Sequence, residues 1–150
     1  MTGIEVLRPG PATTVQDWPG RLGYWQIGVP PSGPMDDVSF RLANIAVGNP
    51  EGAPALEATL AGPALRFAAA RWVCVTGAPV TLTVDGVVVP QWEPVLVPAG
   101  GVLDDRLALV VGVAAADRHP AGQDDEQAGR GDASRGQGRA GLGVGLHEQP

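Results

Sequence analysis

The sequence predicts an all-β fold with one short helix, followed by a disordered tail. Apolar runs of four to seven residues recur along the chain, and glycine or proline separates them, as in proteins built from short strands. The pair Asp85-Gly86 between two such runs adds a hairpin signal. Only the segment at residues 35–50 carries helical apolar spacing. These observations together predict a β-sandwich or β-barrel.

The predicted strands are rich in β-branched and aromatic side chains, which favour an extended backbone. In chain order they are residues 4–7, 24–29, 55–60, 64–67, 71–77, 80–84, 87–90, 94–98 and 106–111. Asp85 and Gly86 separate two of these runs. Because both central positions of a type I′ turn require positive φ, this pair predicts a tight hairpin between the two strands.

The segment MDDVSFRLANIAVGNP, residues 35–50, predicts a helix of about three turns. Asp36 or Asp37 supplies its N-cap, and Gly48-Asn49-Pro50 supplies its stop. Its apolar residues form two stripes: Val38, Leu42, Ile45 and Ala46 in the first, and Phe40, Ala43 and Val47 in the second. We therefore expect the helix to be covered on more than one side.

The composition changes near residue 112. Every aromatic residue lies before this point, whereas residues 113–150 hold many glycines and charged residues and no aromatic side chain. Such a segment buries too little apolar surface to offset the entropy lost on ordering. We therefore expect residues 1–112 to form the folding unit and residues 113–150 to be a disordered, low-complexity tail.

The composition also argues against several classes of function. The net charge is −6, lysine is absent and no basic cluster exists, so we expect neither nucleic acid nor a membrane as a partner. Both histidines lie in the tail, which leaves the folding unit without a histidine triad or a histidine-based metal site. Cys74 stands among valines, as a small buried apolar residue does. Because the N-terminus has no signal-peptide pattern, we expect a cytoplasmic protein.

The stretch GVPPSGPMDD, residues 28–37, precedes the predicted helix. Pro30, Pro31 and Pro34 fix φ and remove hydrogen-bond donors, so the stretch should run extended until the helix begins. One interpretation is a rigid connection between a strand and a helix. The other is a binding loop, in which Ser32, Gly33 and the helix-start amides receive a carboxylate or ureido oxygen at the positive end of the helix dipole.

Glu57 is the polar residue that is hardest to explain by local structure. It lies in the apolar run ALEATL, so its carboxylate either faces water or is buried with a partner. Asp36 is adequately explained as a helix cap, and Asn49 as a turn residue. Taken singly, none of these residues defines an activity.

Taken together, the motifs are more specific. The stretch VLRPGPATTVQDWPGRLGYWQIGVPPSGPMDDVSFRLANIAVGNPEGAPALEATLAGPALRF, followed by VTGA, resembles one carboxyltransferase family. That family includes allophanate hydrolase subunit 2, the C subunit of 5-oxoprolinase and the carboxyltransferase domain of urea carboxylase. The resemblance covers residues 4–100, and YW before GVPPSGPMDD and SFRLAN after it are most similar to the urea carboxylase branch.

The resemblance implies a cyclophilin-like β-barrel subdomain that forms the N-terminal half of a larger domain. It implies transfer of the carboxyl group of carboxybiotin to urea or a related amide, with biotin on a carrier domain or subunit and ATP used only by a partner. The second half of the domain would be required for activity and would cover apolar surface on the first. After Gly101 we expect the family pattern to end, as in a frameshifted or prematurely ended reading frame.

The family-matching positions imply a set of substrate-binding candidates. They are Ser32, Gly33, Met35, Asp36, Asn44, Asn49, Glu57 and Thr59. The resemblance implies a pocket rim at residues 32–36 and buried polar anchoring by Asn44 and Glu57, and it assigns no catalytic residue and no metal ligand. Two alternatives stay open: a noncatalytic binding protein of the same family that antagonises a kinase inhibitor, and a subunit of an ATP-dependent allophanate hydrolase or 5-oxoprolinase complex.

Overall fold

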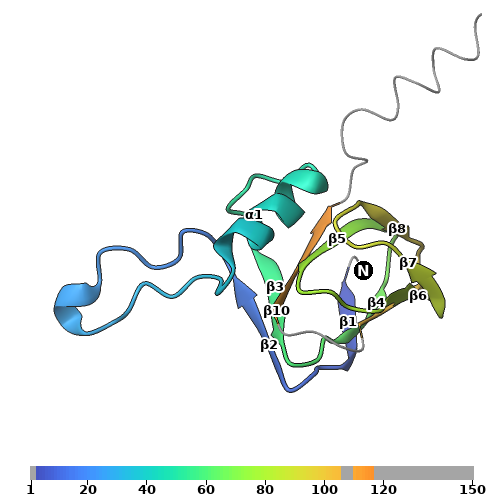
Figure 1. The fold of residues 1–150 in the computed structure, drawn as a ribbon, viewed down its shortest axis with the longest axis horizontal. Coiled ribbons are helices and arrows are strands. Elements are labelled where there is room, and N and C mark those ends of the chain that lie inside the picture. The colour runs from blue at the N-terminus through green and yellow to red at the C-terminus, as the bar shows by residue number, and fades with distance from the viewer. Residues whose placement is uncertain (1–2, 106–109, 117–150) are drawn as a thin grey trace, which may run out of the picture.

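The computed structural model of the chain describes residues 3–105 and 110–116 (Figure 1). The strands within these residues are β1 (Ile4–Arg8), β2 (Ala12–Gln16), β3 (Ala55–Thr59), β4 (Ala64–Phe67), β5 (Arg71–Gly77), β6 (Leu82–Val84), β7 (Val87–Val89), β8 (Val95–Val97), β9 (Val102–Asp105) and β10 (Val110–Ala116). The helices are α1 (Asp37–Ala46) and the short 3-10 helix η1 (Trp25–Ile27). The predicted all-β class with one short α-helix is confirmed.

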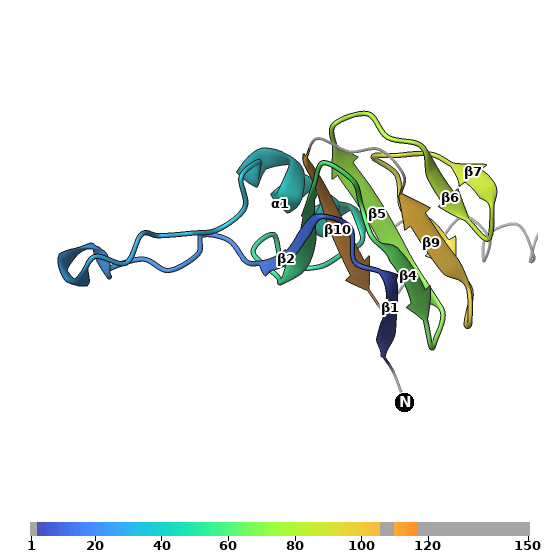
Figure 2. The same ribbon diagram turned by 90° about the horizontal axis from the view of Figure 1, so that it is seen from below.

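The strands form two five-stranded antiparallel sheets (Figure 2). Sheet I has the order β1-β4-β9-β6-β7, and sheet II has the order β2-β3-β10-β5-β8. No strand ladder joins the two sheets within the described residues. The barrel implied by the resemblance is therefore not closed here, and the two sheets pack face to face as a sandwich instead.

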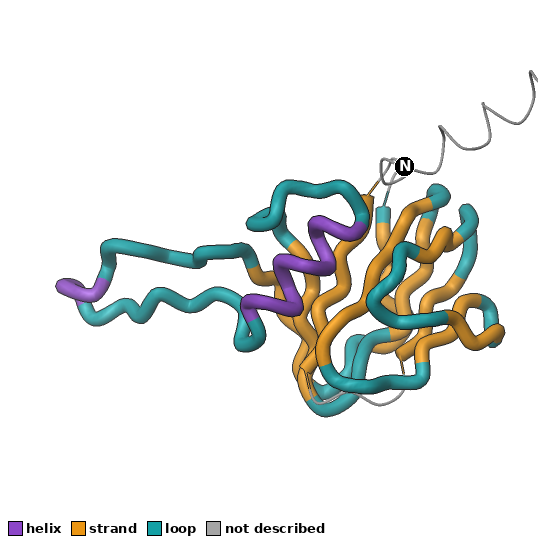
Figure 3. Tube along the Cα trace, turned by 45° about the horizontal axis from the view of Figure 1, so that its top comes forward, coloured by secondary structure: helices purple, strands orange, loops and turns teal. Residues whose placement is uncertain are grey.

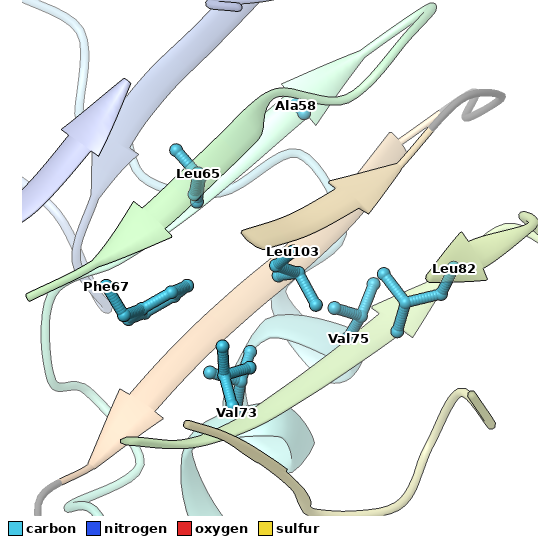
Figure 4. Packing of buried hydrophobic residues seen from close by; sticks show 8 residues of the cluster. Ala58, Leu65, Phe67, Val73, Val75, Leu82 and Leu103 are labelled. Carbon is cyan, nitrogen blue, oxygen red and sulfur yellow. The ribbon is translucent and has the colours of Figure 1, made fainter. Parts of the chain in front are cut away.

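The core lies between the two sheets (Figure 4). Sheet I contributes Leu65, Phe67, Leu82 and Leu103, and sheet II contributes Ala58, Val73, Val75 and Val97. All eight are buried, and each large side chain contributes about 1.5–3 kcal/mol relative to exposure to water. Side chains alternate along a strand. The residues of β5 that flank Val73 and Val75 therefore point to the opposite face of sheet II, away from this core.

Helix α1 covers that opposite face. Phe40, Ala43 and Val47 are buried against Ala55 and Cys74, which form a second core cluster. Of the two predicted apolar stripes, this one is covered. In the other stripe only Ala46 is partly buried against this cluster. The expectation that the rest of that stripe is covered is wrong, because Val38, Leu42 and Ile45 are 45–59% exposed.

The Asp85-Gly86 hairpin is confirmed. Asp85 has φ 50° and Gly86 has φ 81°, and they join β6 to β7. Strands β2 and β9 were not predicted, because neither ATTVQ nor VLDD is a strongly apolar run. β10 continues past residue 112 to Ala116, so the predicted boundary of the folding unit falls inside a strand. The predicted strand at 106–111 overlaps β10 only at its end, and the predicted disordered tail beyond residue 116 lies outside the described residues.

Residues 17–35 form a long projection, here called the arm, that leaves the sandwich after β2 and returns to it at α1 (Figures 1 and 3). The strand predicted at 24–29 is wrong. Residues 25–27 form η1 at the end of the arm, where Ile27 N and Val29 N both donate to Tyr24 O. Gly23 and Gly28, with φ of 85° and 80°, bracket this turn. Within the described residues no strand pairs with this run, so it lacks the ladder that a strand needs.

Candidate functional site

The centre of the candidate site is the carboxylate of Glu57 on β3. Its Oε1 accepts hydrogen bonds from the backbone amides of Met35, at 2.7 Å, and Asp36, at 3.5 Å. The Glu57 residue is only 8% exposed. Of the two alternatives that the sequence allows for Glu57, the structure shows the second: the carboxylate is buried and has partners. It holds the junction between the arm and α1.

Asp36 caps the N-terminus of α1. Its Oδ1 accepts a 3.0 Å hydrogen bond from the amide of Ser39, which makes Asp36 the N-cap of α1. Hydrogen bonds from the Ser39 side chain and from the Ser39 amide hold the pKa of Asp36 below its ordinary value. The amides of Met35, Asp36 and Ser39 are thus bonded to the protein's own carboxylates. The prediction that the helix-start amides receive a substrate oxygen is wrong for these three donors.

A row of residues crosses sheet II beneath the helix start. Glu57 lies directly opposite Thr14 on β2 and Gly112 on β10, and Gly112 lies opposite Thr76 on β5. Thr76, which is buried, donates a 2.7 Å hydrogen bond from Oγ1 to the carbonyl of Ser39. The side chains of Glu57 and Thr76 therefore hold the start of α1 on sheet II through hydrogen bonds.

The arm is attached to the sandwich at its other end as well. The guanidinium of Arg41 lies over the ring of Trp18, 4.2 Å from the ring centroid, and donates to Glu51 Oε2 from Nη2 at 2.7 Å. Trp18 N also donates to Gly52 O, and Gly52 has no room for a side chain because the Trp18 carbonyl lies against it. The two ends of the arm are thus held independently, one by β3 and one by α1 with the loop that follows it.

Asn44 and Asn49 form a second polar group at the far end of α1. The fully buried Asn44 donates from Nδ2 to Ala53 O at 2.9 Å and accepts from Asn49 Nδ2 at 3.1 Å. Asn49 Nδ2 also donates to the carbonyl of Ala115 on β10, at 3.1 Å. These two residues join the end of α1 to the following loop and to sheet II, away from the helix start that Glu57 holds.

The eight predicted residues therefore fall into three groups. Met35, Asp36 and Glu57 are brought together at the arm junction, and Thr59 follows Glu57 on the same face of β3. Asn44 and Asn49 belong to the far end of α1. Ser32 and Gly33 lie out on the arm, where Ser32 is exposed and both have positive φ, of 61° and 97°.

Sequence reasoning did not find the roles of Ser39 and Arg41. Ser39 is the third residue after the Asp36 cap, and this spacing is the position whose amide an N-cap accepts, so the signal existed. No sequence signal relates Arg41 to Trp18, because their contact depends on the path of the arm. Thr76 lies in a largely apolar, buried strand, and only the structure shows its partner, the Ser39 carbonyl.

Cys74 takes no part in the chemistry of this site. It is completely buried, and burial together with the negative charge of Glu93 raises the pKa of its thiol to about 11. A thiol with this pKa is protonated at neutral pH, whereas nucleophilic cysteines need a lowered pKa. The prediction of a small buried apolar residue is confirmed.

A cleft of about 260 Å³ opens between the two sheets. Its lining is apolar and includes Ile4 and Phe67 of sheet I and Val15 and Leu56 of sheet II. None of the eight predicted site residues lines it. The polar site therefore lies on the α1 side of sheet II, and the cleft is a separate feature. No helix in the described part of the chain has the length and hydropathy required to cross a bilayer.

Both the sandwich and the arm junction belong to a known class of domain. The chain belongs to the family described as carboxyltransferase domain, subdomain A and B, whose model matches residues 27–114. The match continues beyond Gly101 and through most of β10, so the expectation that the family pattern ends at Gly101 is wrong.

Named relatives refine this membership. The chain is 52% identical over 102 residues to the urea amidolyase of Saccharomyces cerevisiae, a match covering 68% of this chain and 6% of that protein. It is 43% identical over 75 residues to the C subunit of 5-oxoprolinase from Escherichia coli, covering 50% of this chain and 24% of that protein. The crystal structures of the K. lactis urea amidolyase and of the K. lactis urea carboxylase are both similar, each with a TM-score of 0.72 and 47% identity. Each match covers 75% of this chain, and they cover 7% and 10% of those two chains. This chain thus spans a small part of each relative.

Proposed function

We propose that the chain is the N-terminal part of a biotin-dependent carboxyltransferase that transfers the carboxyl group of carboxybiotin to urea or a related amide. The observation that carries the proposal is the 52% identity over 102 residues to the yeast urea amidolyase. Biotin would arrive on a carrier domain or subunit. ATP would be used by a partner domain or subunit, because the chain offers no lysine for a phosphate loop.

The candidate residues have different tasks under this proposal. Met35 and Asp36 at the arm junction, together with Ser32 and Gly33 before them on the arm, form one rim of the substrate pocket. Glu57 is a positioning residue, because its carboxylate holds the backbone of that rim. Thr59 lies beside it on β3, and Asn44 and Asn49 keep α1 on sheet II.

A cradle for the ureido ring needs donors directed at the ureido oxygen. The amides of Met35, Asp36 and Ser39 already donate to Glu57 and Asp36, so these three do not supply such donors. The remaining donors, and the groups that hold the acceptor amide, would come from the second half of the domain. The isolated chain is therefore expected to be inactive.

A second candidate function is a subunit role in a 5-oxoprolinase, in which a partner consumes ATP. The 43% identity to the E. coli 5-oxoprolinase component supports it. The identity to the urea amidolyase is higher and extends over more of this chain, which favours urea as the acceptor. The two functions differ in the amide that stimulates the reaction.

The test is a chimera. Residues 3–116 of this chain replace the matched segment of the K. lactis urea carboxylase, and ATP-dependent fixation of labelled bicarbonate is measured with urea or 5-oxoproline. We expect fixation that depends on urea in the chimera and none with the isolated chain. A folded chimera that carboxylates its own biotin but transfers nothing to urea would contradict the proposal, and stimulation by 5-oxoproline alone would favour the second candidate.

A further inference from the structure

The arm presents an apolar surface to solvent. Its large apolar side chains Leu22, Tyr24, Trp25 and Ile27, here called the arm patch, are 51–70% exposed. Every residue from 21 to 28 is exposed, and Arg21 is the only charged residue among them. A protein surface that remains in water rarely collects exposed aromatic and aliphatic side chains in this way, whereas interfaces are enriched in tryptophan and tyrosine.

The arm is held in shape by its sequence and by its attachments. Arg21 N donates to Pro31 O at 2.6 Å and links the outgoing and returning sides. Gly20, with φ 77°, packs so closely on this returning side that a Cβ atom would lie 2.7 Å from Pro31 O. Together with the contacts of Trp18 and Glu57 at its two ends, these features reduce the entropy that the arm loses on binding. An arm ordered in this way is suited to docking.

A second exposed apolar group lies on α1. Val38, Leu42 and Ile45, here called the helix stripe, occupy one face of the helix at spacings of four and three residues and are 45–59% exposed. Met35, at the junction between the arm and α1, is 75% exposed. Figure 3 shows η1 at the outer end of the arm and α1 against the sheets, so the arm patch and the helix stripe are two exposed apolar areas at opposite ends of the arm.

We propose that the arm patch and the helix stripe are the docking surface for the remaining part of the carboxyltransferase domain, which covers them with an apolar surface of its own. The inference rests on the proposed function and assigns it a surface. The match covers only 24% of the E. coli 5-oxoprolinase component, so most of that relative's length has no counterpart in this chain. Two copies of the chain would instead bring together two net charges of −6.

Binding to a defined probe tests the docking surface. The probe is the carboxyltransferase domain of the K. lactis urea carboxylase from which the matched segment has been deleted. It is titrated with the full 150-residue chain, and the Kd is measured by calorimetry. We expect a one-to-one complex, with the Kd raised roughly tenfold or more by Trp25→Ser/Ile27→Ser in the arm patch and by Val38→Ser/Leu42→Ser in the helix stripe.

A matched control is available on the opposite edge of the sandwich. Val87 and Val88 of β7 are as exposed as the arm patch, at 68% and 70%, so Val87→Ser/Val88→Ser should leave the Kd unchanged. All substituted side chains are exposed, and the circular dichroism of each variant is expected to match that of the unaltered chain. Absence of a complex, or a complex indifferent to the arm and helix substitutions, would overturn the proposal. Self-association of the chain that the arm substitutions abolish would also overturn it, by making the occupant a second copy.

The chimera separates this inference from the proposed function. If it fixes bicarbonate with urea while the arm substitutions leave its assembly and thermal unfolding unchanged, the docking surface is wrong and the function stands. If the arm substitutions loosen the domain but the unaltered chimera transfers nothing to urea, the docking surface stands and the function is wrong.

Discussion

The carboxylate of Glu57 accepts a 2.7 Å hydrogen bond from the backbone amide of Met35 and thereby joins the middle of β3 to the end of the arm. A buried acid in a strand thus serves as an acceptor for the backbone of a distant segment. The same bond orients the N-terminus of α1 and the rim residues that precede it.

Removing this acceptor should destabilise the chain. Glu57→Ala leaves the part-buried Met35 amide without its acceptor, and we expect a loss of about 1 kcal/mol in the free energy of unfolding. Glu57→Gln keeps an acceptor oxygen and should lose less. Urea denaturation measures both, with the exposed Glu5→Gln as the control. A Glu57→Ala chain as stable as the control would show that the bond contributes nothing.

The Asp36 cap gives a prediction about α1. Asp36→Ala removes the acceptor of the Ser39 amide and should cost about 0.5–2 kcal/mol of unfolding free energy. Asp36→Ser should restore most of this loss, because serine also caps. Loss of helical signal in the circular dichroism spectrum should accompany the lower unfolding midpoint of the alanine variant. Equal midpoints for alanine and serine would contradict the role of the cap.

Acid should weaken the same cap. The pKa of Asp36 is lower in the folded chain than its ordinary value of 3.8, so ionised Asp36 stabilises the fold above pH 3.8. This contribution is lost as the pH falls through the folded-state pKa. Asp36→Asn removes the titration, and the difference in unfolding free energy between the unaltered chain and this variant should shrink in that acidic range. A difference that stays constant with pH would contradict the assignment.

The glycines of the arm allow strain and crowding to be separated. Gly20 and Gly23 both have positive φ, but a Cβ atom at Gly20 would meet the backbone of residues 31–33, whereas nothing lies within 4 Å of Gly23. Gly20→Ala should therefore lower the unfolding midpoint more than Gly23→Ala. Hydrogen exchange at the Arg21 amide, which donates to Pro31, should also accelerate in the Gly20 variant. Equal effects of the two substitutions would mean that the close approach is unimportant.

The thiol of Cys74 should be unreactive in the folded chain. It is buried and its pKa is raised to about 11, so thiolate is scarce at neutral pH. Iodoacetamide should leave the folded chain unmodified and should alkylate it in urea. Because the sequence contains one cysteine, a single mass shift reports the result. Rapid alkylation without urea would contradict the burial.

The sequence was sufficient where local chemistry decides the structure. Asp85 and Gly86 turn a hairpin by themselves, and Asp36 caps α1 by itself. The sequence was insufficient where a partner far along the chain decides. Trp25 and Ile27 are typical strand residues, yet no strand in the described part of the chain pairs with them, and they form η1 on the arm. β2, which is weakly apolar, is a strand because β3 supplies its ladder.

The candidate site divides in the same way. The residue type and apolar setting of Glu57 predicted a buried, partnered acid as one of two outcomes, but only the path of the arm identified the Met35 amide as its partner. The anion-binding interpretation of the helix start is wrong for three amides, because the folded chain supplies their acceptors. Glu57, on a strand further along the sequence, accepts from Met35 and Asp36, and Asp36 accepts from Ser39.

The place of β10 in sheet II sets the order in which the chain can fold during synthesis. β10 is the last described strand, yet it lies between β3 and β5 and pairs with both. While the ribosome has released only the earlier strands, the β2–β3 pair and the β5–β8 pair have no ladder between them. Sheet II therefore becomes continuous only after residues 110–116 have emerged, and nascent chains that stop earlier expose two unfinished strand edges.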